Sequence, residues 1–224
     1  MIKIINNILF LLLIVLGFSS GEIQAQSRSK IKLNTNWKFQ KGDFEEAYKV
    51  NFNDSKWEFV TVPHDWAIYG PFDKNVDKQS VAIVQNGENE ATEKTGRTGA
   101  LPHTGTAWYR NKFTLSKDSK GKKIILLFEG AMSEPQVYLN GKKIGEWAYG
   151  YSYFYFDVSQ FVEEGENTLS VKLTNKEFAS RWYPGAGLYR NVSVIIKNNV
   201  SIDQWGQFVT TPFISDEVAK VKIK

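Results

Sequence analysis

The residues best suited to chemistry lie between positions 177 and 194, where polar, aromatic and glycine-rich stretches follow one another. Arg181, Trp182 and Tyr183 stand directly before a Pro-Gly turn. Aromatic rings can cover the C–H face of a pyranose, and an arginine donates several hydrogen bonds in a fixed geometry. The same large rings can instead plug the end of a β-sandwich. The pattern therefore leaves two interpretations open: a sugar contact made by Arg181 and Trp182, or a structural cap.

Other chemistry finds little support. Hydrolysis of a glycosidic bond with retention of configuration requires two carboxylates roughly 5–5.5 Å apart. The carboxylates worth testing for this role, none in a recognisable catalytic setting, are Asp65, Glu90, Glu129, Glu134, Asp157 and Glu177. The chain has no cysteine and two histidines, His64 and His103, so zinc-like spacing is missing. No glycine-rich phosphate loop precedes a helix. We expect no catalytic residue, no metal site and no cofactor within this chain, and we interpret the adjacent His64 and Asp65 as structural.

The charge pattern argues against nucleic acid as a partner. The formal net charge is +4, and the basic residues alternate with acidic ones and form no stripe. The densest basic patch, residues 120–123, surrounds a glycine and is typical of a solvated turn. No apolar run reaches the ~20 residues that a membrane-spanning helix needs. We therefore expect neither a nucleic acid nor a membrane partner.

The first 25 residues are predicted to be a cleaved signal peptide. Lys3 precedes an apolar run at residues 8–18, small residues follow, and Ala25 stands at the expected cleavage position. This pattern predicts a secreted or periplasmic protein. The lack of cysteine is compatible with a domain held together by its core alone.

The loop that carries Arg181, Trp182 and Tyr183 is predicted to belong to a β-sandwich. Short alternating strands punctuated by Gly, Pro, Asn and Asp recur from Asn36 onward. Asn140-Gly141 between two such runs predicts a tight hairpin. In the tract 149–156, alternation places Phe154 and Phe156 in the core and Tyr151, Tyr153 and Tyr155 on the other face. These tyrosines could bind sugar or pack on a further domain.

Two stretches interrupt the strand pattern. Residues 66–102 form a long loop with several glycines, and loops of this length are usually functional or contact a neighbour, although disorder is an alternative. From residue 200 the regular strand pattern ends, and the sequence predicts a linker. An alternating strand follows at 218–223, and we expect it to be the unpaired first strand of a second sandwich. We divide the chain into a signal peptide (1–25), a sandwich domain (26–199) and an incomplete second domain (200–224).

Five motifs resemble the N-terminal sugar-binding domain of glycoside hydrolase family 2, the family of β-galactosidases, β-glucuronidases and β-mannosidases. They occur in the same order as in the family, and the resemblance covers roughly residues 33–197. The motifs are Val62–Trp66, Thr95–Pro102, Ala107–Arg110, Val137–Gly141 with Gly150-Tyr151, and Ser180–Arg190. The resemblance implies a jelly-roll β-sandwich of the galactose-binding type, followed by an immunoglobulin-like sandwich and a catalytic barrel. Both catalytic glutamates of the family come from that barrel, so we expect this chain to be inactive alone.

The resemblance also implies where substrate is contacted. One contact in the family is an Asp a few residues before the motif that matches Gly187–Arg190, and Arg181 occupies that position here. The departure matters because an arginine donates hydrogen bonds where a carboxylate accepts them. A second contact is an Asn in the long loop after Trp66, with Asn75 as the nearest counterpart. The predicted substrate-binding residues are thus Arg181, Trp182 and Asn75.

We expect this chain to be the non-catalytic N-terminal portion of a secreted β-galactosidase-like glycoside hydrolase. Its expected partners are a galactoside-like carbohydrate and the downstream domains of the same enzyme. The β-galactosidase branch is favoured by Thr95–Pro102 and by Trp108–Arg110. Two alternatives stay open: a free-standing carbohydrate-binding module, and a purely structural β-domain.

Overall fold

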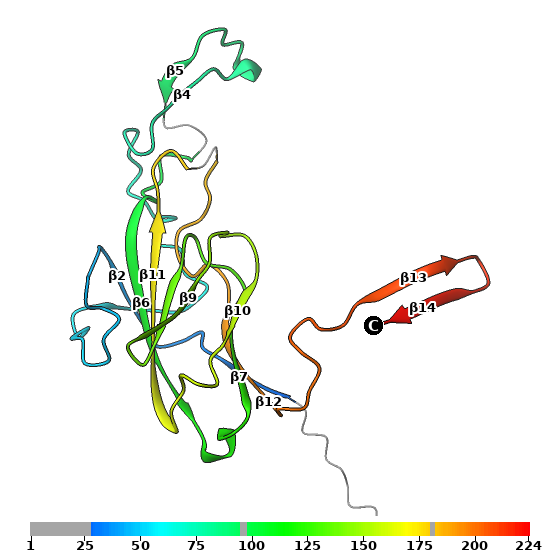
Figure 1. Cartoon of the computed structure of the whole chain (residues 1–224). Coiled ribbons are helices and arrows are strands. Elements are labelled where there is room, and N and C mark those ends of the chain that lie inside the picture. The colour runs from blue at the N-terminus through cyan, green and yellow to red at the C-terminus, as the bar shows by residue number, and fades with distance from the viewer. Residues whose placement is uncertain (1–27, 95–97, 180–181) are drawn as a thin grey trace, which may run out of the picture.

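The chain folds as two antiparallel β-sheets packed face to face, and this computed structural model describes residues 28–94, 98–179 and 182–224 (Figure 1). The four-stranded sheet has the order β1 (Arg28–Lys32), β12 (Val192–Lys197), β7 (Lys123–Phe128), β10 (Phe154–Asp157). The six-stranded sheet has the order β3 (Glu58–Val60), β2 (Trp37–Lys41), β6 (Gly105–Leu115), β11 (Gly165–Asn175), β8 (Gln136–Leu139), β9 (Lys142–Glu146). Helical structure among the described residues is limited to two short 3₁₀ turns, η1 (Val84–Asn86) and η2 (Lys117–Ser119). The predicted all-β jelly-roll sandwich is confirmed.

The core between the sheets follows the alternation of the sequence. On β6 the side chains of Tyr109 and Phe113 are buried in it, and on β7 those of Ile124 and Phe128. Phe154 from β10 stacks on Phe128 with ring centroids 4.8 Å apart. Each such side chain stabilises the fold by about 1.5–3 kcal/mol when fully buried. This core is what holds the loops at either end of the sandwich in place.

The outer face of the six-stranded sheet is covered by residues 43–57. Arg110, which points outward from β6, is 2% exposed, and its guanidinium donates to Asp54 Oδ2 at 2.8 Å and to Ser170 Oγ at 2.9 Å. It also donates to the carbonyl oxygens of Ala47 and Lys49. A buried charge needs such partners, so the arginine fixes the covering segment on the sheet. The covering segment therefore shields the Arg110 side chain from solvent.

The hairpin at Asn140-Gly141 is confirmed. Both residues have positive φ, 50° and 79°, as a two-residue connection between β8 and β9 requires. The Asn140 side chain donates to Asn167 Oδ1 at 2.8 Å and accepts from the Thr168 N–H at 2.9 Å. The basic patch at residues 120–123 covers the turn before β7 and the first residue of that strand, Lys123.

The tyrosines of the tract 149–156 have different surroundings. Phe154 is in the core, while Tyr155 packs outward against Trp205, with ring centroids 5.1 Å apart. Tyr153 also meets Trp205 edge-on at 6.3 Å. Tyr151 lies in the turn before β10 and not in the strand. The shared face predicted for the three tyrosines thus holds for two of them, and those two pack on the segment that follows β12.

The expectation of an unpaired strand at 218–223 is wrong. β14 (Ala219–Ile223) pairs with β13 (Val209–Ile214) in a hairpin that projects from the sandwich (Figure 1). The stretch 209–214, assigned above to the linker, forms β13 although it contains Pro212, a residue that is rare in strands. The ladder accommodates it by a register shift between Thr210 and Phe213.

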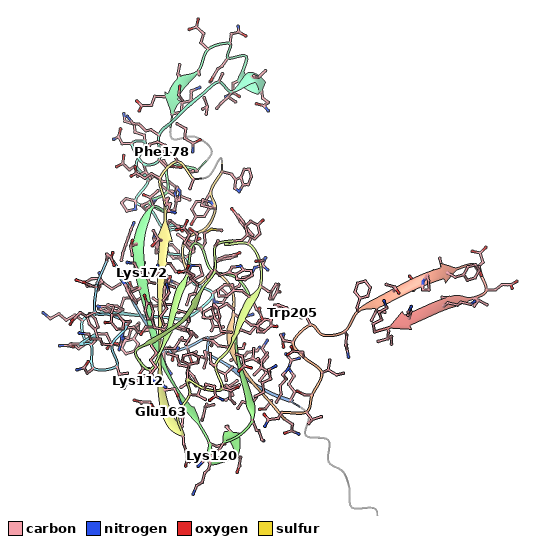
Figure 2. All side chains as sticks on the ribbon, viewed as in Figure 1. Lys112, Lys120, Glu163, Lys172, Phe178 and Trp205 are labelled. Atoms are coloured by element: carbon pink, nitrogen blue, oxygen red, sulfur yellow. The ribbon has the colours of Figure 1, made fainter. Side chains whose placement is uncertain are left out.

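The long loop carries a short β-pair of its own. β4 (Gln79–Val81) and β5 (Thr92–Lys94) form a two-stranded arm that extends from one end of the sandwich, while Lys120 and Glu163 lie at the opposite end (Figure 2). Glu88 ties the arm together by accepting from the Ile83 N–H at 2.9 Å and from Lys94. Within the described ranges, no helix is long and apolar enough to cross a membrane.

Candidate functional site

The loop that carries Trp182 is attached to the sandwich by its backbone. Gly187 and Met132 exchange two hydrogen bonds, of 2.9 and 3.0 Å, in an isolated antiparallel bridge. The His64 N–H donates to the Leu188 carbonyl, and the Trp66 N–H donates to the Ala186 carbonyl. The segment 182–190 is therefore held on two sides before any side chain contributes.

Asp65 then organises the start of this loop. Its two carboxylate oxygens accept from the Tyr183 hydroxyl at 2.5 and 2.6 Å, and Oδ2 also accepts from the Ala186 N–H at 3.2 Å. The Ala67 N–H donates to Oδ1 at 3.0 Å. Burial, followed by this hydrogen bond and the carboxylate charge, raises the pKa of Tyr183, so the phenol stays protonated and donating. Asp65 is engaged as an acceptor for the loop.

Beneath the loop, the partly buried His64 contacts the fully buried Tyr109. His64 Nδ1 lies 2.7 Å from the Tyr109 hydroxyl. Burial raises the pKa of Tyr109 and lowers the pKa of His64, so the phenol stays protonated and the neutral imidazole is favoured. His64 and Asp65 thus contact different partners, and both lie in an irregular segment before the long loop.

Trp182 borders a hollow of about 370 Å³ at this end of the sandwich. The indole is 56% exposed, and its Nε1 donates to the Tyr151 hydroxyl at 3.2 Å. Tyr149 and Tyr151 lie beside each other with ring centroids 5.7 Å apart. The remaining lining residues are His103, Met132, Ser133, Glu134, Ala148, Gly150, Asn175, Lys176, Ala179 and Pro184. Three partly exposed aromatic rings therefore share one concave surface.

Asn175 joins the loops that form the wall of this hollow. Its Nδ2 donates to the carbonyls of His103 and Gly185, at 2.9 and 3.1 Å. Its Oδ1 is buried and has no hydrogen-bond partner in the described structure. Nearby, the Phe178 N–H donates to Asp77 Oδ1 at 2.6 Å and so connects this wall to the base of the projecting arm (Figure 2).

The three predicted substrate-binding residues differ in where they lie. Trp182 is placed in the wall of the hollow. Asn75 lies exposed in the turn before β4, where its N–H donates to Asp73 Oδ1 at 2.8 Å, and it is not among the described residues that line the hollow. Arg181 lies outside the described residues. All three assignments stay predictions.

The described residues offer no acidic or histidine cluster suited to a metal ion. Of the carboxylates considered above, Glu129 accepts from Asn191 and Lys30, and Glu134 pairs with Lys176 at 2.6 Å. Asp157 accepts from its neighbour Ser159. These groups are occupied in structural contacts at separate places on the sandwich.

Comparison with known proteins defines the family. The sequence model described as "Glycosyl hydrolases family 2, sugar binding domain" matches residues 31–199. The chain belongs to glycoside hydrolase family 2. The matched range begins in β1 and ends just after β12, so it coincides with the two-sheet sandwich.

Relatives in the family include a β-galactosidase of Bacteroides ovatus and a putative β-glucuronidase of Formosa agariphila. Each is 33% identical to this chain, over 93% and 95% of it. A crystal structure of a family 2 member from Bacteroides cellulosilyticus superposes on 87% of the chain with a TM-score of 0.71 and 30% identity. A Bacteroides uniformis β-glucuronidase does so on 88% with a TM-score of 0.69 and 28% identity. The chain spans 19–24% of the length of these four proteins.

Sequence reasoning missed two features of this family 2 site. Asp65 was considered as a candidate catalytic carboxylate and interpreted, with His64, as structural, but its contact with Tyr183, 118 residues away, leaves no local trace in the sequence. Asn175 ends the long strand β11, where an alternating pattern gives no reason to single it out. Tyr151 was named, but its proximity to Trp182 depends on the turn before β10.

Proposed function

We propose that this chain is the non-catalytic N-terminal region of an exported, β-galactosidase-type glycoside hydrolase, and that the end of the sandwich bearing Trp182 forms part of the mouth of the active site. The family match over residues 31–199 supports a role in carbohydrate hydrolysis. The relatives are about four times as long as this chain, which leaves room for the immunoglobulin-like sandwich and the catalytic barrel. The two catalytic carboxylates would come from that barrel.

The observation that carries this proposal is the position of Trp182. Its indole is more than half exposed, yet the next residues are fixed by the Tyr183–Asp65 contact and by the bridge at Gly187. An exposed aromatic ring on a rigid base can bind the C–H face of a sugar at little cost in conformational entropy. Asn75 and Arg181 are the polar contacts proposed to accompany it.

The test is kinetic and uses the full-length enzyme. Trp182→Ala is expected to lower kcat/KM for an aryl β-galactoside roughly two- to tenfold, which corresponds to about 0.5–1.5 kcal/mol of lost ring contact. Phe59→Ala is a suitable control, because Phe59 is 68% exposed but lies on β3 at the edge of the six-stranded sheet. Unchanged kinetics in Trp182→Ala would contradict the role in the mouth, and faster hydrolysis of an aryl β-glucuronide would contradict the galactosidase assignment.

Titration of the isolated chain separates this proposal from the two alternatives. A part of an active-site mouth contributes only some of the contacts of a complete site, so we expect weak or undetectable affinity of residues 26–224 for galactosides. Tight binding that Trp182→Ala abolishes would favour a free-standing carbohydrate-binding module. Unchanged kinetics in every variant, together with a lowered melting temperature, would favour a purely structural domain.

Export is part of the proposal. The basic residue, apolar run and small residues of positions 1–25 support cleavage after Ala25 and a secreted or periplasmic location. N-terminal sequencing of the protein from the producing cells is expected to begin at Gln26. A mature protein that begins at Met1 would overturn this part.

A further inference from the structure

We propose that the hollow between β1 and the segment 198–207, on the outer face of the four-stranded sheet, binds a negatively charged sugar unit of an acidic polysaccharide. The ligand chemistry is a pyranose ring that carries a carboxylate or a sulfate group. The site lies outside the active-site mouth proposed above, and Figure 2 shows Trp205 beside the sandwich, between the ends marked by Phe178 and Lys120. Its role is to hold the enzyme on a polymer without contacting the bond that is cleaved.

The hollow has the size and the walls of a ligand site. Its volume is about 710 Å³, within the ~300–1,000 Å³ typical of ligand pockets. One wall is β1, whose Arg28 and Lys30 point to the same side because side chains alternate along a strand. The segment 198–207 and Tyr153 supply other parts of the lining. A cationic strand and a segment that carries an indole thus line one concave space.

The charges of the lining leave an excess of positive charge at Arg28. Lys30 pairs with Glu129 at 3.2 Å, and the buried Lys197 donates to the Ile202 carbonyl at 3.0 Å. Arg28 is exposed, and no acidic side chain of the described residues forms an ion pair with it. A guanidinium presents several donors in a fixed fork that matches the oxygens of an anionic group. The hollow therefore has an open contact for one carboxylate or sulfate.

Trp205 is presented to the hollow by an unusual backbone conformation. Its φ of 56° lies in the left-handed region, where a bulky residue is an outlier. The Gly206 N–H donates to the Asp203 carbonyl at 3.0 Å, and the Asp203 side chain pairs with Lys123 at 2.9 Å, so the turn is held on the sheet. The indole packs on Tyr155 with centroids 5.1 Å apart and is still 58% exposed. Strained residues of this kind cluster at ligand sites, and a fixed indole binds the C–H face of a sugar with little loss of freedom.

The remaining polar groups favour a saccharide over a nucleic acid or an acidic peptide. Three amide side chains line the hollow: Asn198, Gln204 and Gln207. Amides both donate and accept, as the hydroxyls of a sugar do. A nucleic acid is held by several cations along its phosphates, whereas Lys30 and Lys197 are already engaged here.

Other hollows of the described structure lack this combination. One of about 570 Å³, at the end of the sandwich away from the arm, is lined by no aromatic residue. One of about 300 Å³ on the outer face of the six-stranded sheet has a single ring, Phe59, which Lys38 Nζ already covers at 3.6 Å from the ring centroid. Its arginine, Arg110, is paired with Asp54. An open cation beside an exposed ring is thus a property of the hollow under residues 198–207.

The test measures binding to the full-length enzyme by isothermal titration calorimetry. The charged probes are trigalacturonate and a sulfated cellotriose, and unsulfated cellotriose is the neutral probe. Arg28→Gln is expected to weaken binding of the charged probe about tenfold, and Arg28→Lys less, because the charge is kept. Trp205→Ala is expected to weaken it roughly two- to tenfold and Trp205→Phe less, because a ring is kept. Lys120→Gln is the matched control, since it removes one positive charge from an exposed turn away from the hollow.

The two charged probes identify the anionic group. Binding of trigalacturonate alone supports the site with a carboxylate as its ligand, and binding of the sulfated cellotriose alone supports it with a sulfate. Binding of neither probe, or equal weakening by Arg28→Gln and Lys120→Gln, would overturn the site. Equally tight binding of unsulfated cellotriose would overturn the anionic class. Tighter binding of polyglutamate or of a single-stranded DNA oligomer would overturn the assignment to sugar.

Two controls keep this inference separate from stability and from the proposed function. Because Trp205 also covers an apolar sheet face, melting temperatures are compared, and Arg28→Gln and Trp205→Phe decide the outcome if Trp205→Ala does not fold. All folded variants are expected to keep kcat/KM for an aryl β-galactoside within twofold of the unmodified enzyme. A parallel loss of this activity in Arg28→Gln would overturn a site remote from the mouth. Failure of the unmodified enzyme to hydrolyse any galactoside would instead contradict the proposed function.

Discussion

Replacement of Gly187 by alanine tests whether the backbone at this position fixes the loop that carries Trp182. Gly187 has φ +131°, a region that side-chain-bearing residues rarely adopt. A β-carbon there would lie 2.4 Å from the Tyr109 hydroxyl oxygen and 2.5 Å from the His64 carbonyl oxygen. Neither neighbour can retreat easily, because Tyr109 is fully buried and the His64 contact is with backbone.

The cost can be estimated in two parts. Backbone strain at a φ of this kind contributes about 1–3 kcal/mol. Overpacking of a filled site contributes about 1–3 kcal/mol more. A total near 4 kcal/mol would lower the melting temperature by roughly 8–16 °C for a domain of this size. Gly165→Ala provides the control, since Gly165 has φ +91° but nothing within 4 Å of the position of its β-carbon, so it should show the strain alone.

The assay is thermal unfolding of residues 26–224, followed by tryptophan fluorescence. The reasoning predicts a clearly larger loss for Gly187→Ala than for Gly165→Ala. Equal losses would mean that the clash with Tyr109 and His64 is relieved at no cost. A loss below about 2 °C for Gly187→Ala would refute both parts of the estimate.

Two further predictions concern the contacts beneath the loop. Asp65→Asn should destabilise the fold by about 1.5–3 kcal/mol, because the negative charge is removed and one of the two oxygens that accept from Tyr183 and the Ala186 N–H is replaced by an NH2 group, which cannot accept. Denaturant unfolding of Asp65→Asn, Tyr183→Phe and the double variant should give non-additive losses, and full additivity would rule out a shared contact. Burial lowers the pKa of His64, against smaller opposing effects of Glu58 and Asp65, so its contribution to stability is complete above the unfolded value of about 6.5 and decreases as the pH falls through that value. His64→Gln should therefore flatten the decline in melting temperature between pH 7.5 and 5.5, and an unchanged slope would count against this assignment.

Sequence periodicity was sufficient for most of the sandwich. The strands β6, β7 and β11 show strict alternation or a continuous apolar run, and Asn140-Gly141 imposes its hairpin by local backbone geometry. Alternation failed where another segment covers the sheet. Arg110 has the position of an exposed residue on β6, yet it is buried because residues 43–57 fold over it.

The candidate site was less predictable, because its contacts join distant positions. Tyr183 meets Asp65, Trp182 meets Tyr151, and Phe178 meets Asp77, each across at least 31 residues. Local patterns identified Trp182 as suited to sugar. They could not show that it shares a hollow with Tyr151, because that depends on how two loops leave the same end of the sandwich.

The segment after β12 has a consequence for where the domain can be cut. Ile125, Leu127 and Ile195 are buried on the outer face of the four-stranded sheet, and Tyr155 packs against them and on Trp205. Lys123 also pairs with Asp203 at 2.9 Å. Expression of a unit that stops at residue 199 would remove this cover and leave an apolar sheet face open to water. A protein prepared for crystallisation or binding studies should therefore extend at least to residue 207, and the shorter form is expected to self-associate.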